Sequence, residues 1–192
     1  MSREIILASG SPRRTKQLKD IGLDFQVMES QFVEQMEKRG NPERLAEENA
    51  LGKAKTVANK IEKGIVIGAD TIVVLNSRVM GKPKSVKEAR DMLHKISGKK
   101  VYIITGLAIV DVEEQEALTD VVVTETKIKK LEEQEIDSYV ACGEPLDKAG
   151  AFAIQGKGAF MVEWIKGDYH AAVGLPLFAL IQHLRKFGVT IF

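Results

Sequence analysis

The sequence predicts an α/β fold built around a mixed β-sheet. Short apolar segments alternate with amphipathic segments that begin at capping residues, a pattern typical of strand–helix crossover units with parallel strands. In the middle of the chain, two long apolar segments instead follow one another across a short polar turn, as the strands of an antiparallel hairpin do. The two kinds of strand connection together indicate a mixed sheet.

Local signals define the first elements. Ile5–Ala8 is a short apolar run that we expect to form a buried strand. Ser11 is the predicted N-cap of a helix with Pro12 in its first position, where the missing N–H of proline costs nothing, and Gly22 is expected to end this helix. Apolar residues alternate over residues 23–27, which predicts a second strand.

The following segments continue the alternation of helices and strands. Asn41 and Pro42 begin a helix that we expect to end at Gly64, directly before the apolar strand Ile65–Leu75. A capping box opens the next helix, over residues 85–98, and a glycine ends it.

The second half of the chain begins with the hairpin. Its two strands are expected at Val101–Val112 and Ala117–Ile128. A helix is predicted over Glu132–Cys142 and a strand over Gly158–Ile165. The sequence Gly-Leu-Pro then begins a final helix within residues 174–188, which a glycine ends.

Composition and charge restrict the partners of the protein. The 192 residues include 28 basic and 27 acidic side chains, and the net charge of +1 gives no electrostatic basis for binding nucleic acid or a membrane. The single cysteine, Cys142, cannot form an internal disulfide, as expected in a reducing compartment. The chain has neither the roughly 18 apolar residues of a membrane span nor a signal-peptide pattern. We therefore expect a cytoplasmic protein.

The stretch LASGSPRR, residues 7–14, points to an anion. Arg13 and Arg14 lie in the first turn of the predicted helix, where a cation is unfavourable beside the positive end of the helix dipole unless a negative group compensates it. Guanidinium groups bind phosphate in a bidentate manner, and Ser9 adds a hydroxyl at the same place. Phosphate binding is one explanation, and pairing of both arginines with surface carboxylates is the other.

Three further charged residues are candidates for a site. Lys53 falls on the apolar face of its helix, where it either extends to solvent along its own stem or enters a cleft and meets an anion. Asp70 interrupts a buried strand beside the small residue Gly68, and a buried carboxylate needs a hydrogen-bond network, a cation or a metal as its partner. Lys82 lies in a rigid Gly-Lys-Pro turn, either as an ordinary loop lysine or as part of the same site.

Several segments together resemble the Maf family of nucleoside triphosphate pyrophosphatases. They occur in the family's order and spacing from Leu7 to about Leu184: LASGSPRR, IGADTIVV, GKPKS, ISGK, TGLAI, GEPLDKAGAFAIQGKG and GLPL. The resemblance implies one domain over residues 1–192, with a long curved mixed sheet and two lobes around a cleft, similar to the inosine triphosphatase fold. It also implies hydrolysis of a nucleoside triphosphate to the monophosphate and pyrophosphate with a divalent metal, Mg²⁺ or Mn²⁺.

The resemblance further implies roles for individual residues. Asp70 matches the family's catalytic base, and Glu34 and Asp70 match its metal-binding positions. The residues implied in substrate binding are Ser9, Arg13, Arg14, Lys53, Thr71, Lys82 and Gln155. Their four cations would offset the charge of the triphosphate and of the leaving pyrophosphate.

The family divides into one group that acts on dTTP and UTP and another that acts on 7-methyl-GTP. Arg13, Thr71 and Gln155 match the first group, and a glutamine amide can pair with the carbonyl and N3–H edge shared by uracil and thymine. We therefore expect dTTP and UTP as substrates, with 7-methyl-GTP as the alternative, and a homodimer by analogy with the family. A different class of protein, a nucleotide- or nucleic-acid-binding regulator of septum formation, would need the basic cluster but no buried acid.

Overall fold

One mixed sheet organises the chain, which confirms the predicted α/β class. The computed structural model describes residues 3–35 and 40–191. Within them the strand order is β2-β1-β3-β5-β6-β7, with β4 paired to β3. β1 pairs in parallel with β2 and β3, whereas β3, β5, β6 and β7 pair in antiparallel fashion. The strands are β1 (Ile5–Leu7), β2 (Gln26–Val27), β3 (Ile65–Leu75), β4 (Arg78–Met80), β5 (Lys100–Asp111), β6 (Glu116–Ile128) and β7 (Val162–Lys166).

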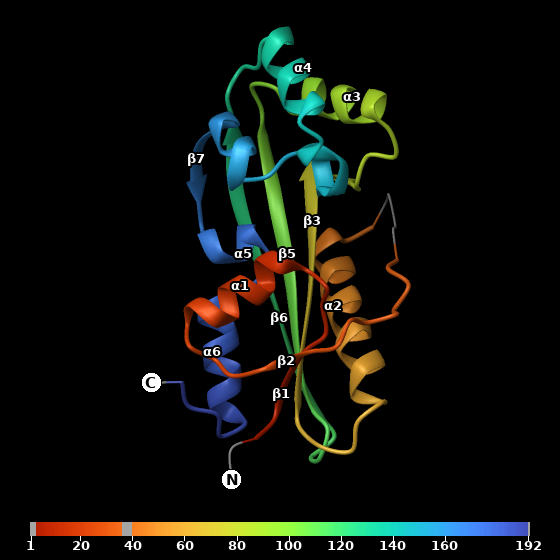
Figure 1. Ribbon diagram of the computed structural model, residues 1–192, viewed down its shortest axis with the longest axis vertical. Helices are drawn as coiled ribbons and strands as arrows, with labels where there is room; N and C mark the ends of the chain where they lie inside the picture. The colour runs from red at the N-terminus through yellow and green to blue at the C-terminus, as the bar shows by residue number, and fades with distance from the viewer. Residues whose placement is uncertain (1–2, 36–39, 192) are drawn as a thin grey trace.

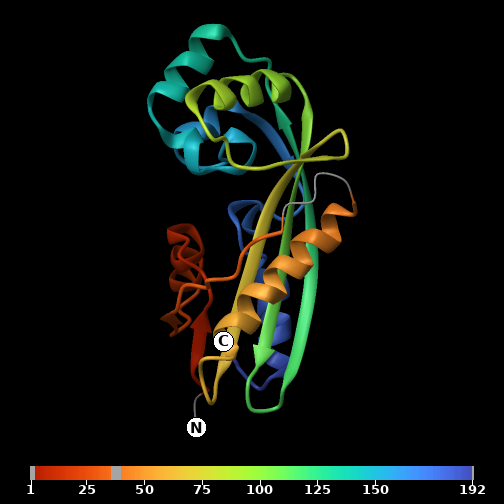
Figure 2. The same ribbon diagram turned by 90° about the vertical axis from the view of Figure 1, so that its right-hand side faces the viewer.

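Helices cover both faces of the sheet and one of its ends. α2 lies along one face, and α1 and α6 pack on the opposite face (Figure 1). α3, α4 and three short 3₁₀ helices pack around one end of the long strands, the end that holds Leu75, Val101 and Ile128 (Figure 2). The helices are α1 (Pro12–Asp20), α2 (Pro42–Ala58), α3 (Val86–Ile96), α4 (Glu133–Ala141), η1 (Glu144–Asp147), η2 (Ala149–Ala151), η3 (Gly156–Met161), α5 (Tyr169–Val173) and α6 (Leu177–Lys186). No helix of the described ranges is long and apolar enough to cross a lipid bilayer.

The helix α2 approaches the sheet very closely. A Cβ atom built on Gly68 of β3 would lie 2.4 Å from the carbonyl oxygen of Ala50, and one built on Gly106 of β5 would lie 2.2 Å from that of Ala46. Glycine on the strands, opposite alanine on the helix, leaves room for this approach. The side chains of α2 that face β3 are therefore held close to that strand.

Two predicted boundaries in the first half of the chain are wrong. The second strand contains only Gln26–Val27, because only these residues pair with β1. The helix α2 ends at Ala58 rather than near Gly64, and the intervening residues form the turn that leads into β3. Gly64 is needed there for its backbone, which has a φ of +114°.

In the second half, the predicted strand Gly158–Ile165 begins only at Val162. The carboxylate of Glu144 accepts hydrogen bonds from the backbone N–H groups of Lys157 and Gly158, and the segment forms η3 instead. The short elements β4 and α5 were not predicted. The hairpin strands β5 and β6 lie within one residue of their predicted bounds.

Candidate active site

The residues implied by the family resemblance all line one cavity, whose volume is about 690 Å³. They are Ser9, Arg13, Arg14, Glu34, Lys53, Asp70, Thr71, Lys82 and Gln155. The loops around α1 and the helix α2 form one side of the cavity, and the segments around β4, η1 and η2 form the other. The fold thus brings together residues that are far apart in the sequence.

The cavity lies beside an interruption in the edge of the sheet. β1 pairs with β3 only along Ile65–Ile67, and β4 pairs with it only along Val73–Leu75. Between these stretches, residues 68–72 pair with β5 on one side, and no described strand pairs with them on the other. Asp70 and Thr71 lie in this interruption. Because successive side chains of a strand point to opposite faces, Asp70 meets α2 and Thr71 meets α1.

Asp70 is held by two side chains of α2. The residue is only 4% exposed, and Lys53 Nζ donates to its Oδ1 at 2.6 Å. Asn49 Nδ2 donates to its Oδ2 at 3.0 Å. The Lys53 ammonium also lies 2.6 Å from Oε1 of Glu34. Lys53 therefore enters the cavity, which decides between the two alternatives that the sequence left open.

The two neighbouring arginines have different surroundings. Arg14 donates through Nε to the carbonyl oxygen of Gly174 at 2.8 Å, and through its terminal nitrogens to the hydroxyls of Ser9 at 3.1 Å and Thr71 at 3.2 Å. Burial lowers the pKa of Arg14, and the negative charge of Asp70 opposes this effect. Two of its five N–H groups remain for a ligand.

Arg13, by contrast, has a buried donor without a partner. Its Nε atom is inaccessible to water, and within residues 3–35 and 40–191 no acceptor forms a hydrogen bond with it. Such a donor is costly to leave unpaired. Arg13 as a residue nevertheless lines the cavity, so its positive charge would attract an anion bound there. Neither arginine forms the surface ion pair considered as the alternative, as far as the described side chains show.

The far side of the cavity carries Lys82 and Gln155. Gln155 Nε2 lies 3.1 Å from the hydroxyl of Tyr169 and donates to it. The loop that follows Gln155 is held by Glu144, which also accepts a hydrogen bond from Tyr139 at 3.1 Å. Burial raises the pKa of Glu144, but these hydrogen bonds outweigh it, and the pKa lies below its ordinary value.

Two buried polar residues at the site were not predicted. Asn49 lies four residues before Lys53, so its place on the same helix face was visible in the sequence. Thr105 of β5 continues a chain of hydrogen bonds from Arg14 through Thr71, at 3.0 Å, to the carbonyl oxygen of Ala171, at 2.8 Å. No sequence signal marks Thr105, because its contact depends on the register between β3 and β5.

Comparison with known proteins identifies the family of this chain. The family model described as "Maf-like protein" matches residues 4–187. A protein of Methanococcoides burtonii named "dTTP/UTP pyrophosphatase" is 47% identical over 191 residues, covering 99% of this chain and 98% of that protein. Proteins with the same name from Dictyoglomus thermophilum and Bacillus cereus are 44% and 43% identical and cover 100% and 98% of both chains.

Among solved structures, the Staphylococcus aureus Ham1 protein aligns with 66% of this chain and 72% of its own, at 19% identity and a TM-score of 0.46. The family match extends over nearly all of the sequence, and the relatives align along almost their whole lengths. The chain therefore belongs to the Maf family.

Proposed function

We propose that this protein hydrolyses nucleoside triphosphates, preferably dTTP and UTP, to the nucleoside monophosphate and pyrophosphate, and so removes them from the nucleotide pool. The names of the relatives support this reaction. The observation that carries the proposal is the buried carboxylate of Asp70, held against Lys53 in a cavity that two arginines also line. A site that only bound nucleotides would need the cations but not this acid.

The charges of the cavity suit a triphosphate. Arg13 and Arg14 line the cavity on one side, and Lys82 lines it on the other. Arginine and lysine side chains reduce the repulsion between a polyanion and an attacking water, and they stabilise the charge that develops on the leaving pyrophosphate. Ser9 is fixed beside the phosphate path by its hydrogen bond from Arg14.

Asp70 is the proposed general base. It accepts a proton from the water that attacks the α-phosphorus, while the bond between that phosphorus and the bridging oxygen breaks and pyrophosphate leaves. Such general-base assistance typically accelerates a reaction by about 10²–10⁴-fold. Lys53 and Asn49 each occupy one oxygen of the carboxylate, so its plane is fixed before substrate binds.

Glu34 and Asp70 are the residues that we propose for a divalent cation, Mg²⁺ or Mn²⁺. Their carboxylates lie against the same Lys53 ammonium, so both reach one region of the cavity. Carboxylate oxygens are suitable ligands for these ions. The described residues contain no group of three or more His, Cys, Asp and Glu side chains placed to hold a metal, so phosphate oxygens would complete the ligand set. When bound, the cation supplies positive charge that polarises the phosphate.

The proposed base preference depends on Gln155, with Thr71 and Arg13 as the other two residues of the pattern. With Nε2 directed to Tyr169, the carbonyl oxygen of Gln155 is available to accept the N3–H of uracil or thymine. Cytosine has an unprotonated N3 and would leave that oxygen unpaired. A buried unpaired polar group costs about 1–3 kcal/mol, which corresponds to a discrimination of roughly tenfold or more.

We also propose a cytoplasmic homodimer, each subunit being one domain with two lobes around the cavity. Only the resemblance to the family supports this part of the proposal. Light scattering on the purified protein measures the oligomeric state directly, and a monomer would contradict it.

A panel of kcat/KM values tests the proposed function. The substrates are dTTP, UTP, CTP, ATP, GTP and 7-methyl-GTP, each with Mg²⁺ and with Mn²⁺, and the products are separated by chromatography. We expect monophosphate and pyrophosphate, with dTTP and UTP at least tenfold better than CTP. A preference for 7-methyl-GTP would overturn the base assignment alone. Tight binding without turnover would support a nucleotide-binding regulator instead.

A further inference from the structure

The side chain of Asn49 is fully engaged at the centre of the site. It is 1% exposed and lies on α2. Its Oδ1 accepts from the backbone N–H of Gln35 at 2.9 Å, and its Nδ2 donates to the carbonyl oxygen of Gln35 at 3.1 Å. The same Nδ2 donates to Oδ2 of Asp70 at 3.0 Å. One carboxamide thus joins the segment that carries Glu34 to the buried carboxylate.

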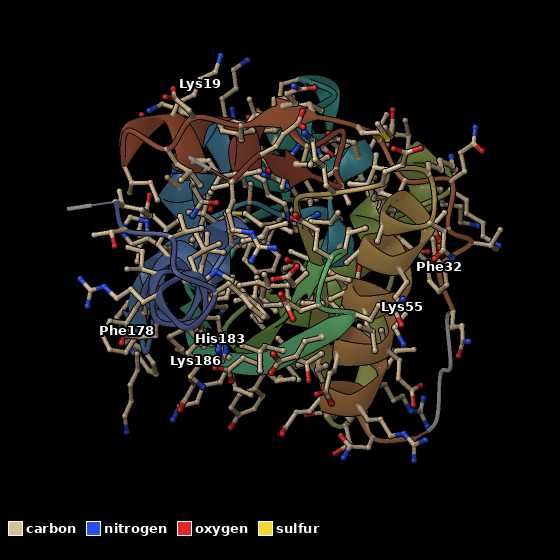
Figure 3. All side chains as sticks on the ribbon, turned by 90° about the horizontal axis from the view of Figure 1, so that it is seen from below. Lys19, Phe32, Lys55, Phe178, His183 and Lys186 are labelled. Carbon is tan, nitrogen blue, oxygen red and sulfur yellow. The ribbon has the colours of Figure 1, made fainter. Side chains whose placement is uncertain are left out.

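The segment before Gln35 has no helix or strand of its own after β2. Asn49 pairs with the backbone N–H and C=O groups of Gln35, as a neighbouring strand would in a β-sheet. The side chain of Phe32 lies beside α2 (Figure 3). Its ring provides a second contact with the helix, because a Cβ built on Gly52 would lie 2.3 Å from it. Glu34 lies between these two attachments, so α2 determines where its carboxylate is placed.

The same helix determines the orientation of Asp70. Asn49 and Lys53 are four residues apart, on one face of α2, and they donate to different oxygens of the carboxylate. Two donors on different oxygens prevent the carboxylate from turning about its Cβ–Cγ bond. Each oxygen keeps a further lone pair for water or a cation.

We propose that Asn49 is a positioning residue for the hydrolysis described above, on which this inference rests. Its carboxamide holds the Asp70 carboxylate in one orientation and holds Glu34 beside it, without contacting the substrate. Leucine at this position would fill a similar volume but would leave both backbone groups of Gln35 unpaired and Asp70 with Lys53 as its remaining donor. Misplacing a reacting group by about 1 Å costs on the order of 100-fold in rate. Asn49→Leu should therefore lower kcat for UTP by roughly 10- to 100-fold and change KM by less than about threefold.

The test compares kcat, KM and Tm for six proteins. They are the wild type, Asn49→Leu, Asp70→Asn, the double variant, Asn41→Ala and Asn49→Asp. Asn41 caps the same helix by accepting hydrogen bonds from Glu43 and Arg44 backbone N–H groups, so Asn41→Ala weakens α2 from outside the site.

Because Asn49 acts in part through Asp70, Asn49→Leu should lower kcat by a smaller factor in the Asp70→Asn background than in the wild type, since coupled residues are not additive. Asn41→Ala should lower Tm but keep the wild-type kcat. Asn49→Asp keeps the acceptor for Gln35 but puts a second carboxylate against Asp70, and its kcat should fall at least as far as that of Asn49→Leu. If Asn49→Leu does not fold, Asn49→Asp serves in its place.

Three results would overturn the proposal. The first is a multiplicative loss of kcat in the double variant, and the second is a loss of Tm in Asn49→Leu or Asn49→Asp with kcat unchanged. The third is a decrease in kcat for Asn41→Ala as large as that for Asn49→Leu, because it would mean that Asn49 affects turnover only by stabilising α2. Failure of the proposed function is distinguishable from all three, because the wild type would then release no pyrophosphate from UTP, and the positioning role would fall with it.

Discussion

Replacing Gly68 with alanine should destabilise the protein, because the new methyl group has no space. Its Cβ would lie 2.4 Å from the carbonyl oxygen of Ala50 and 2.9 Å from the Cβ of Ala54, where ordinary contacts begin near 3.4 Å. The helix α2 must therefore retreat from β3 by about 1 Å. Overpacking of this kind costs about 1–3 kcal/mol, and each kcal/mol lowers Tm by about 2–4 °C in a chain of this length.

The same movement should reduce activity, although Gly68 does not line the cavity. α2 carries Asn49 and Lys53, whose hydrogen bonds to Asp70 are 3.0 and 2.6 Å long. A retreat of about 1 Å breaks the longer bond and stretches the shorter one, and a misplacement of that size costs on the order of 100-fold in rate. We therefore expect kcat for UTP to fall by about 10²-fold.

Thermal unfolding and steady-state kinetics measure the two effects. Gly188→Ala is the matched control, because Gly188 follows α6 with a φ of +74°, and no atom of the described residues other than its two chain neighbours lies within 4 Å of its built Cβ. Strain at that φ costs about 1–2 kcal/mol, so the control loses a similar amount of stability but should keep its kcat. A Gly68→Ala variant with wild-type kcat, or a control that loses as much activity, would refute the reasoning.

Three further predictions concern charged groups. Asp70→Asn should keep the circular dichroism spectrum of the wild type and lower kcat by about 10²–10⁴-fold; near-normal turnover would remove Asp70 as the base. Glu144→Gln should lower Tm at neutral pH. The pKa of Glu144 is lower in the folded protein than in the unfolded chain. The ionised carboxylate therefore stabilises the fold above the pKa of the unfolded chain, and this stabilisation is lost as the pH falls through the pKa of the folded protein. The Tm values of the wild type and of Glu144→Gln, plotted against pH, should therefore converge in acid. Asp111→Asn should cost about 1–3 kcal/mol in urea unfolding, because it breaks the ion pair in which the half-buried Arg3 donates to both oxygens of the buried Asp111 at 2.5 Å; a loss below about 1 kcal/mol would show that this pair resembles a surface one.

Elements with strong local patterns could be predicted from the sequence. The bounds of β3 are those predicted, because a mainly apolar run between turns specifies a buried strand even where Asp70 interrupts it. The final helix also follows its predicted capping signals closely. The strand predicted at Gly158–Ile165 failed in its first half because a distant carboxylate, that of Glu144, binds the backbone there. Such a contact has no trace in local periodicity.

The candidate site likewise has contacts that the sequence could predict and contacts that it could not. The resemblance placed Lys53 and Asp70 in one site, and the structure shows their contact. The attachment of Gln35 to Asn49 could not be predicted, because it forms between a loop without regular structure and a helix that packs from another part of the chain. The chain of hydrogen bonds through Thr105 likewise depends on strand register, which sequence patterns do not determine across such distances.

The position of water attack tests the central claim most directly. Hydrolysis of UTP in H₂¹⁸O, followed by mass spectrometry of the products, identifies the phosphorus that the water attacks. Attack at the α-phosphorus, as proposed, places ¹⁸O in UMP and leaves the pyrophosphate unlabelled. Label in the pyrophosphate, or UDP and orthophosphate as the first products, would contradict the account.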